Sequence, residues 1–346
     1  EQVQDSIQKA QQDKEQLSRQ DTAVVTADSI SLANAKKQLG DFAYSASLPS
    51  ATDAETTLEN DLLKITVANK GGQIKAVELK KFKTYDQRPL YLIKDSNAAF
   101  NINFNTSDNR VLNTRDLYFE PALSKNGENQ VLSMKLKVAE DRYLEYRYEI
   151  KPDDYLLDFA IKSQGLNSNI NTSQNIDLEW GLKAFREEKS LKVENMYTEM
   201  YFKNDGDVSY LSKGNEDSKT ENSLEWVAYK QHFFTSILKT DQPFKEAQIT
   251  SVNLVKDEDI DTVYTKEFTL KAPLEMKNGD LNYAMNWYFG PTDYKTFLKY
   301  EGTDFVDVAD LGWGIFGWIN RYIFYPVFDF LKPLIGNYGI IIILMT

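Results

Sequence analysis

Regular alternation of apolar and polar side chains constrains the fold of this chain more than any other feature of its sequence. In the clearest run, YLEYRYEIKPDDYLLDFAIKSQG at residues 143–165, every second side chain falls on one face of an extended strand. Its apolar positions are Leu144, Tyr146, Tyr148 and Ile150 and, after a turn at Pro152, Asp153 and Asp154, Tyr155, Leu157, Phe159 and Ile161. Glu145, Arg147 and Glu149 point the other way. The pattern predicts two antiparallel strands joined by a tight turn.

Similar runs recur along the chain, in LLKITVANKGGQIKAVEL, VLSMKLKVA and YTKEFTLKAPL. In the first, residues 69–72 are a hairpin or loop signal, and we interpret Gly71 and Gly72 as turn residues. Many strands with turns between them predict a mainly β fold, an antiparallel sandwich with wet outer faces, and not a parallel doubly wound sheet. A length of about 240 residues is ordinary for one large sandwich, so we predict a single domain over residues 57–304.

Charge and composition exclude several classes of function. The 346 residues carry 40 Lys and Arg against 52 Asp and Glu, and this net charge of −12 opposes binding to nucleic-acid phosphates. Cysteine is absent, which excludes disulfides, thiolate metal sites and thiol nucleophiles, and a single histidine leaves few options for a metal site or a catalytic triad. We expect no nucleic-acid partner, no metal and no cofactor.

An enzymatic function has no positive support in the sequence. Large antiparallel sandwiches can hold sugar-processing sites, in which carboxylates or a histidine move protons. The one histidine, His232, lies in EWVAYKQHFFTSIL among aromatic and aliphatic neighbours, a pattern that favours packing. The sequence contains no Gly-rich phosphate loop, no HExxH and no Gly-x-Ser-x-Gly motif. We predict no catalysis, and a carbohydrate-binding or mutarotase-like sandwich is the alternative.

The N-terminal residues 1–56 are rich in Gln, Asp, Ser and Ala and poor in large apolar side chains. Because they cannot offset the entropy of ordering, we interpret them as a polar tether. Val3, Ile7, Ala10 and Leu17 fall near helical spacing, which allows one short helix, either solvated or used for docking. The chain begins at Glu1 without a methionine or an apolar targeting segment, so we expect a fragment of a longer protein.

The C-terminal residues follow a helical pattern. A helix drawn through residues 314–331 has an apolar side, formed by Ile315, Ile319, Ile323 and Val327. Its opposite side carries polar groups, from Asn320, Arg321, Asp329 and Lys332, with Phe324, Tyr325 and Phe328 among them. With aromatic residues at its borders, such a segment suits the headgroup zone of a bilayer, and we predict an amphipathic interfacial segment over residues 305–335. Proline inside a helix costs ~3 kcal/mol, which predicts two short pieces with Pro326 opening the second.

The chain closes with GNYG and then IIIILMT. A bilayer crossing needs ~20 apolar residues, and a run this short would also suit a buried core strand. Because the run follows an aromatic amphipathic segment, with Tyr338 as an interfacial anchor, we interpret residues 336–346 as the start of a truncated transmembrane helix.

These residues carry a family resemblance. LGWGIFGWINRYIFYPVFDFLKPLIGNYGIIIILMT is similar to a junction in the YidC/Oxa1-type membrane protein insertases, where a Gly-Trp element, an interfacial helix and a Gly-Asn-aromatic-Gly motif lead into the second transmembrane helix. NKGGQIKAVELKKFKTYD, WVAYKQHFFTSIL and YFGPTDYKTFLK extend the resemblance over most of Leu58 to Thr346. The long acidic, Gln-rich N-terminal region resembles the Bacteroidetes versions of the family.

The resemblance implies a fold, a location and a function. The fold would be a periplasmic β-super-sandwich, similar to galactose mutarotase, placed between the first two membrane helices of a bacterial inner-membrane protein. The function would be that of a chaperone that helps new inner-membrane proteins insert and fold, alone or with the Sec translocon. The net charge of −12 agrees with an extracytoplasmic location. No residue up to Thr346 matches the arginine of the family's insertion groove, so we expect the fragment alone to be incompetent for insertion.

The implied partners are the lipid bilayer, Sec translocon subunits, for which the sandwich could be a platform, and nascent inner-membrane proteins reached through a transmembrane core. Candidate residues for the membrane interface, some of which would alternatively pack on the sandwich, are Trp313, Phe316, Trp318, Arg321, Tyr322, Phe324, Tyr325 and Tyr338. Family-motif positions with an expected structural role are Gly71, Gly72, Trp226, Lys230, Phe233, Phe234, Tyr288, Gly290, Pro291 and Tyr294. The motif around residues 226–234 implies a helix, and that around residues 288–294 a strand end and turn.

Overall fold

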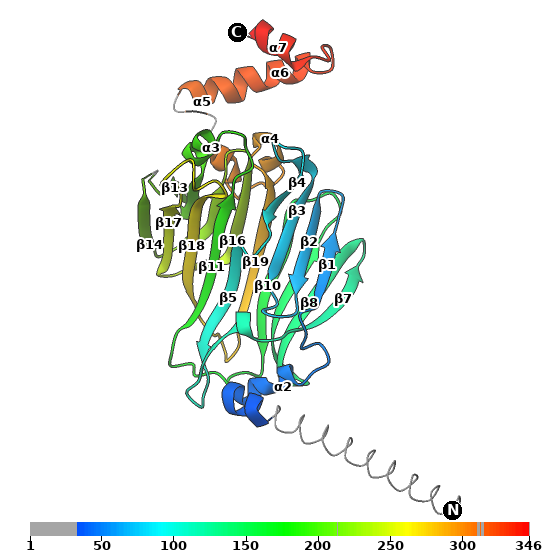
Figure 1. Cartoon of the computed structure of the whole chain (residues 1–346), viewed down its shortest axis with the longest axis vertical. Coiled ribbons are helices and arrows are strands. Elements are labelled where there is room, and N and C mark those ends of the chain that lie inside the picture. The colour runs from blue at the N-terminus through cyan, green and yellow to red at the C-terminus, as the bar shows by residue number, and fades with distance from the viewer. Residues whose placement is uncertain (1–32, 213, 310–311, 313–314, 346) are drawn as a thin grey trace, which may run out of the picture.

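The structure is a computed structural model that describes residues 33–212, 214–309, 312 and 315–345. Figure 1 shows a β body with short helices at one end, near α2, and with α5, α6 and α7 beyond the other end. The candidate helix through Val3, Ile7, Ala10 and Leu17 lies outside the described residues.

The largest sheet has nine strands in the order β13-β12-β15-β16-β19-β10-β9-β8-β7. Its strands are β7 (Glu120–Asn126), β8 (Asn129–Ala139), β9 (Arg142–Ile150), β10 (Leu156–Gln164), β12 (Glu199–Asn204), β13 (Asp207–Tyr210), β15 (Leu224–Lys230), β16 (Phe234–Phe244) and β19 (Asn282–Pro291). Neighbouring strands pair antiparallel throughout this sheet.

Two smaller antiparallel sheets complete the body, with the orders β14-β17-β18-β11-β5-β6 and β1-β2-β3-β4. The six-stranded sheet contains β5 (Ala98–Asn105), β6 (Val111–Asn113), β11 (Ile176–Phe185), β14 (Glu216–Glu221), β17 (Ala247–Asn253) and β18 (Tyr264–Leu274). The four-stranded sheet contains β1 (Glu55–Glu59), β2 (Leu63–Ala68), β3 (Ile74–Lys83) and β4 (Pro89–Ile93). The predicted fold class, a mainly β antiparallel sandwich, is confirmed.

Aromatic rings from facing sheets meet in the core. Phe100 of β5 lies 5.5 Å from Phe159 of β10 and 5.5 Å from Trp287 of β19, centroid to centroid. Trp180 of β11 packs edge-on against Trp287 at 4.8 Å. All four side chains are buried. The six- and nine-stranded sheets are therefore the two layers of a sandwich with a core of large aromatic side chains.

The alternation in residues 144–161 predicts the observed strands correctly. Leu144, Tyr146, Tyr148 and Ile150 on β9 are at most 2% exposed, while Glu145 and Arg147 are half-buried on the opposite face. Glu149 is buried on that outer face, because Asn126 and Asn129 of the β7–β8 hairpin donate hydrogen bonds to its carboxylate. The turn at 152–154 also forms, with Asp153 at a φ of +49°.

The four-stranded sheet also packs on the large sheet, and its β2–β3 turn contains the two predicted glycines. Gly71 and Gly72 have φ angles of +84° and +61°, a region that favours glycine. A Cβ atom on Gly72 would lie 2.8 Å from the ring of Phe119, and the Tyr148 hydroxyl donates to the Gly72 carbonyl oxygen at 2.8 Å. The interpretation of these glycines as turn residues is confirmed.

Part of the segment interpreted as a tether packs on the sandwich. Residues 33–39 are helical, and η1 (Gly40–Phe42) and α2 (Ala43–Ala46) follow. Phe42 is buried against Phe104, with ring centroids 5.1 Å apart, and the Ser45 hydroxyl donates to the Tyr118 carbonyl oxygen at 2.5 Å. The sequence did not predict this contact, because one buried phenylalanine does not stand out in a region with few apolar residues.

The helix implied for WVAYKQHFFTSIL is wrong. Trp226 and Lys230 lie on β15, Phe233 lies in the connection, and Phe234 begins β16, so the stretch is a β-hairpin. Val227 and Tyr229 are as buried as Trp226 and Ala228, because both faces of β15 are covered. A strand that is buried on both faces loses its alternation, and its apolar residues can then mimic helical spacing.

The C-terminal residues form three short helices, α5 (Ile315–Ile319), α6 (Tyr325–Leu331) and α7 (Tyr338–Met345). Pro326 lies in the first turn of α6, as predicted, but the two pieces are not separate, because a π-helical turn, η4 (Asn320–Phe324), joins α5 and α6 into one continuous helix. Most of IIIILMT is helical in α7 and does not form a core strand. Within the described residues, every helix is too short or too polar to cross a bilayer.

Candidate functional site

The end of the sandwich below the C-terminal helices is closed by short helical elements. These are α3 (Leu191–Tyr197), α4 (Tyr294–Phe297) and η3 (Phe305–Ala309). We call residues 315–345 the C-terminal segment, and Figure 1 shows it beyond this end of the body, close to α3 and α4. The segment and the sandwich end form the candidate site, because most residues predicted to act at a membrane interface belong to them.

Polar groups of the C-terminal segment face the sandwich. The Arg321 guanidinium lies 5.2 Å from the ring centroid of Tyr294 on α4 and 4.0 Å from a carboxylate oxygen of Asp307 on η3. Asp329 of α6 forms an ion pair with Lys295 of α4. The rings of Tyr325 and Tyr294 lie 5.4 Å apart. Among the described side chains, Arg321, Tyr325 and Asp329 therefore couple the segment to the body.

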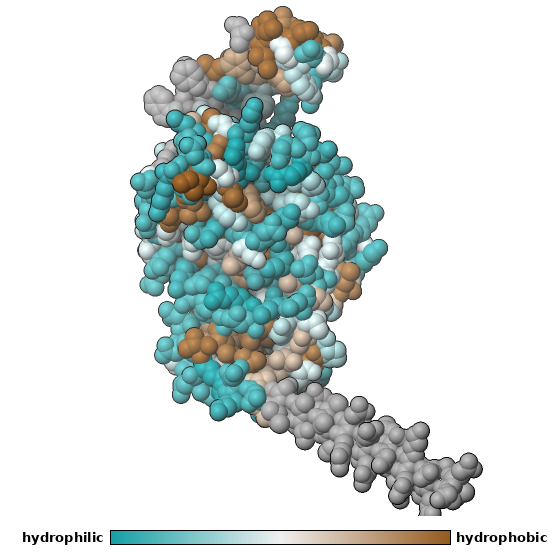
Figure 2. Space-filling view, in the orientation of Figure 1, coloured by the Kyte–Doolittle hydropathy of each residue, from teal (hydrophilic) through white to brown (hydrophobic). Residues whose placement is uncertain are grey.

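The opposite side of the segment is apolar and open to solvent. Trp318 is 56% exposed, Phe330 70% and Ile343 75%. The other large apolar side chains exposed in the segment are Tyr322, Ile323, Phe324, Val327, Leu334, Tyr338, Ile340, Ile342 and Leu344. Figure 2 shows hydrophobic residues gathered over α7. Exposed apolar area of this extent marks an interaction surface.

The predicted interface residues divide between these two sides. Trp318, Tyr322, Phe324 and Tyr338 are exposed, whereas Arg321 and Tyr325 lie against the sandwich. Trp313 lies outside the described residues, as does the side chain of Phe316. Sequence reasoning also missed Lys295, Asp307 and Asp329 as the partners that fix the segment, because a pairing between positions so far apart leaves no local pattern.

Residues of the family motifs anchor the base of the site. The Trp226 indole N–H donates to the Thr303 carbonyl oxygen at 2.8 Å, and its ring packs against Phe305 of η3 at 5.7 Å. The Tyr288 hydroxyl donates to the Pro291 carbonyl oxygen at 2.7 Å. A Cβ atom on Gly290 would lie 2.7 Å from the Tyr288 hydroxyl oxygen, so only glycine fits there. The strand end and turn implied for 288–294 are present as the end of β19 and the start of α4.

Where the C-terminal segment meets the sandwich, partial burial shifts the pKa values of two side chains. Burial, together with the negative charge of Asp304, raises the pKa of the Asp307 carboxyl, and the Arg321 guanidinium opposes this shift. Burial also raises the pKa of the Tyr325 hydroxyl. The Arg321–Asp307 contact therefore weakens in acid, when Asp307 takes up a proton.

The one histidine lies near the same end, between two aromatic rings. The imidazole of His232 stacks on Tyr197 at 4.3 Å and on Phe233 at 4.0 Å, centroid to centroid. Its Nδ1 atom lies 2.6 Å from a carboxylate oxygen of Glu188. Two stacked rings and one polar contact describe a packed histidine. Among the described residues, His, Asp and Glu side chains form no cluster suited to holding a metal ion.

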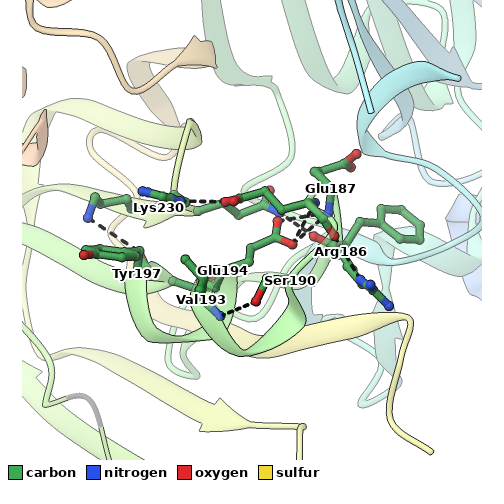
Figure 3. Close-up of polar contacts among 12 residues, drawn as sticks. Arg186, Glu187, Ser190, Val193, Glu194, Tyr197 and Lys230 are labelled. Carbon is green, nitrogen blue, oxygen red and sulfur yellow. Dashed lines mark hydrogen bonds and ion pairs between the residues drawn. The ribbon is translucent and has the colours of Figure 1, made fainter. Parts of the chain in front are cut away.

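Buried charges lie on the elements next to this histidine in the chain and in space, β15 and α3. The Lys230 ammonium, on β15, pairs with Glu199 of β12 at 3.2 Å, and both side chains are almost fully buried. Figure 3 shows the Lys230 ammonium beside Tyr197 of α3, while the Glu194 carboxylate of the same helix points toward Glu187. The Glu194 carboxylate accepts hydrogen bonds from the backbone N–H groups of Glu187 and Glu188 at 3.0–3.1 Å. Sequence reasoning missed Glu187 and Glu194, whose burial depends on strands distant in the chain.

Comparisons with known proteins add the remaining evidence. A family model described as the YidC periplasmic domain matches residues 55–326. A membrane protein insertase YidC from Parabacteroides distasonis is 36% identical over 85% of this chain and 47% of that protein. One from Porphyromonas gingivalis is 36% identical over 99% of this chain and 54% of that protein. The chain thus spans about half the length of the curated relatives it matches.

Solved structures give weaker likenesses. A crystal structure of an active YidC insertase with its first transmembrane domain resolved matches with a TM-score of 0.42 and 12% identity, over 85% of this chain and 53% of that chain. A putative aldose 1-epimerase from Escherichia coli K12 matches with a TM-score of 0.41 and 11% identity, over 68% of this chain and 98% of that chain. Likenesses at this level carry no information on activity.

Proposed function

The chain belongs to the YidC family of membrane protein insertases, whose periplasmic domain it matches, and from this premise we propose that it is the periplasmic part of an insertase and chaperone of the bacterial inner membrane. The whole protein would help new inner-membrane proteins insert and fold, alone or with the Sec translocon. Its partners would be the lipid bilayer, the nascent proteins and Sec translocon subunits. The sandwich itself would have no catalytic role.

One observation carries the proposal for this part of the protein. The C-terminal segment turns its charged side to the sandwich, through Arg321 and Asp329, and its apolar side to the surroundings. In water this arrangement exposes side chains such as Trp318 and Phe330 at a cost, whereas at a bilayer surface the same side chains are buried. Tryptophan and tyrosine favour that interface because their rings are apolar and their tips polar.

We infer from this arrangement that the sandwich positions the segment. Two charged contacts and one ring pair hold the segment against α4 and η3, so the body fixes which side faces lipid. The α7 helix, with its isoleucine run, would then enter the membrane as the beginning of a transmembrane helix. The family-motif residues Trp226 and Tyr288 would serve as packing for this junction.

The carbohydrate-processing alternative receives no support from the placement of His232. Its ring faces are covered by Tyr197 and Phe233, and its Nδ1 atom is engaged with Glu188. A proton-transfer role would require the imidazole to face a substrate in a cleft.

Vesicle binding tests the proposal directly. The chain should co-sediment with vesicles of phosphatidylethanolamine and phosphatidylglycerol, and Trp318→Asp should weaken its partitioning by about tenfold or more, because burial of a large apolar side chain contributes roughly 1.5–3 kcal/mol. Leu123→Asp, at a side chain that is 58% exposed on β7, is the matched control and should bind normally. No binding, or equal loss in both variants, would refute the proposed role of the segment.

A further inference from the structure

A pocket of about 550 Å³ opens at the same end of the sandwich as the C-terminal segment. The residues that define its chemistry are Phe82, Tyr85, Phe233, Phe234, Glu187 and Asp293. Asp293 caps α4 by accepting a hydrogen bond from the Thr296 backbone N–H at 2.8 Å, and Tyr294 and Lys295 of the same helix contact the segment. The pocket and the segment therefore share one structural support.

Glu187 is an unusual feature of this pocket. Its side chain is only 7% exposed, and within the described ranges its carboxylate is attracted by the Arg88 guanidinium but makes no hydrogen bond or ion pair. Figure 3 shows that it points away from Glu194. A buried carboxylate without a partner is costly, so the exposed remainder of this group, in the lining of the pocket, is a site prepared for a donor or a cation.

The backbone around Glu187 is held by several hydrogen bonds, which fix where its side chain starts in the pocket lining. Its backbone N–H donates to the Glu194 carboxylate at 3.0 Å, and its carbonyl oxygen accepts from the Tyr85 N–H at 3.1 Å. The Ser190 hydroxyl accepts from the Val193 N–H at 3.3 Å and caps α3, which carries Glu194. The loop and helix in Figure 3 thus form a fixed cradle.

The most exposed charged residues of the pocket lining are two lysines, while the acidic Glu188 and Asp293 are half-buried. Lys83 and Lys189 are exposed residues of the lining, and neither ammonium has an ion-pair partner in the described part of the chain. Tyr85 and Phe233, which are 48% and 53% exposed, add apolar surface beside them. A ligand that fits would place an ammonium group at the buried Glu187, a phosphate at the exposed lysines and an apolar part against Tyr85 and Phe233.

We propose that this pocket binds the headgroup of an ethanolamine phospholipid, with its ammonium on Glu187, its phosphate at Lys83 and Lys189, and its glycerol against Phe233. The choice of a lipid over other amines rests on the proposed function, because the lipid-facing segment and the pocket share α4 as a support. The pocket would then hold the sandwich at a defined height on the membrane.

Titration of Glu187 gives the site a pH signature. Burial, reinforced by the negative charge of Glu194, raises the pKa of the Glu187 carboxyl to about 8, and burial raises that of Glu194 to about 7. Arg88 and Asp86 also act on the Glu187 carboxyl, and the other charged residues of the same pocket lining are Lys83, Glu188, Lys189 and Asp293. Since an ammonium binds the ionised carboxylate, headgroup affinity should rise by roughly tenfold per pH unit until the pH reaches this pKa.

The test uses dihexanoyl phosphatidylethanolamine as a monomer in solution, titrated into the full chain by calorimetry. Because no bilayer is present, its outcome is independent of whether the C-terminal segment binds vesicles. Saturable binding is expected, and Glu187→Gln should reduce the affinity by about tenfold or more while leaving the fold intact, since it removes a charge-assisted contact but keeps the shape. Glu275→Gln, at an exposed pair with Lys245, is the matched control and should bind normally.

Competing ligands complete the test. Dihexanoyl phosphatidylglycerol has the phosphate without the amine and should bind at least about tenfold more weakly. Equal binding of the two lipids, or unchanged binding by Glu187→Gln, would overturn the proposal. Tighter binding of a lysine-containing peptide than of the ethanolamine lipid would also overturn it, and would assign the pocket to a protein ligand.

Discussion

The sandwich body and the C-terminal segment use similar apolar side chains in opposite ways. In the body, Trp180, Trp226 and Trp287 are at most 2% exposed, whereas Trp318 in the segment is 56% exposed. The body buries these side chains within its own core, so they need no contact with a membrane or another protein. The segment satisfies only its charged side within the chain, through Lys295 and Asp307, and leaves its apolar side for another surface. This difference is what we expect of a segment that works at a boundary between water and an apolar phase.

The first way to break this comparison is to damage the body alone. Trp287→Ala removes a ring that packs against Phe100, Phe159 and Trp180, so it should lower the free energy of unfolding by roughly 3–5 kcal/mol. Chemical denaturation measures the loss. Vesicle binding of the molecules that remain folded should be unchanged, and a variant that keeps its full stability would show that these rings do not form the core.

The second prediction concerns the pH dependence of the body. In the folded chain the Glu187 pKa is raised from 4.5 to about 8, so the folded state binds more protons and stability falls as the pH rises through that range. The Glu187→Gln variant has no charge to bury. Its free energy of unfolding should equal that of the parent below pH 4.5 and exceed it by roughly 1–3 kcal/mol at and above about pH 8. Denaturation at several pH values measures the difference, and parallel curves would contradict it.

The smallest expected effect is on the attachment between the two regions. Lys295→Ala removes the exposed ion pair with Asp329, which should change the free energy of unfolding by less than about 1 kcal/mol. The sharper readout is hydrogen exchange in α6, where protection should fall while protection in β10 and β19 stays constant. A loss of protection that spread through the sandwich would mean that the segment is part of the body.

The sequence predicts features that depend on neighbouring residues and misses those that depend on residues far apart in the chain. Alternation on a strand with one wet face, as in β9, is a local signal, and the glycines of the β2–β3 turn are another. For the β15–β16 hairpin the family resemblance implies a helix, and no local pattern corrects this, because β15 is covered on both faces and carries no alternation. Glu187 and the contacts of Arg321 depend on partners far away in the chain, which no local pattern encodes.

The amphipathic pattern of residues 314–331 predicts that the segment has two unlike sides, and the structure agrees. It cannot predict which partner each side meets. The charged side meets the sandwich through α4 and η3, and this depends on a fold that the pattern does not contain. Contact of the apolar side with lipid stays a prediction.

Lipid contact of the segment is the central claim, and site-directed labelling tests it most directly. The chain has no cysteine, so Phe330→Cys and Lys125→Cys each carry a single label, on the apolar side of α6 and on the distant strand β7. When vesicles are added, the label at position 330 should become shielded from a water-soluble quencher, while the label at position 125 should remain accessible. Equal access of the quencher to both labels in the presence of bound vesicles would contradict the account.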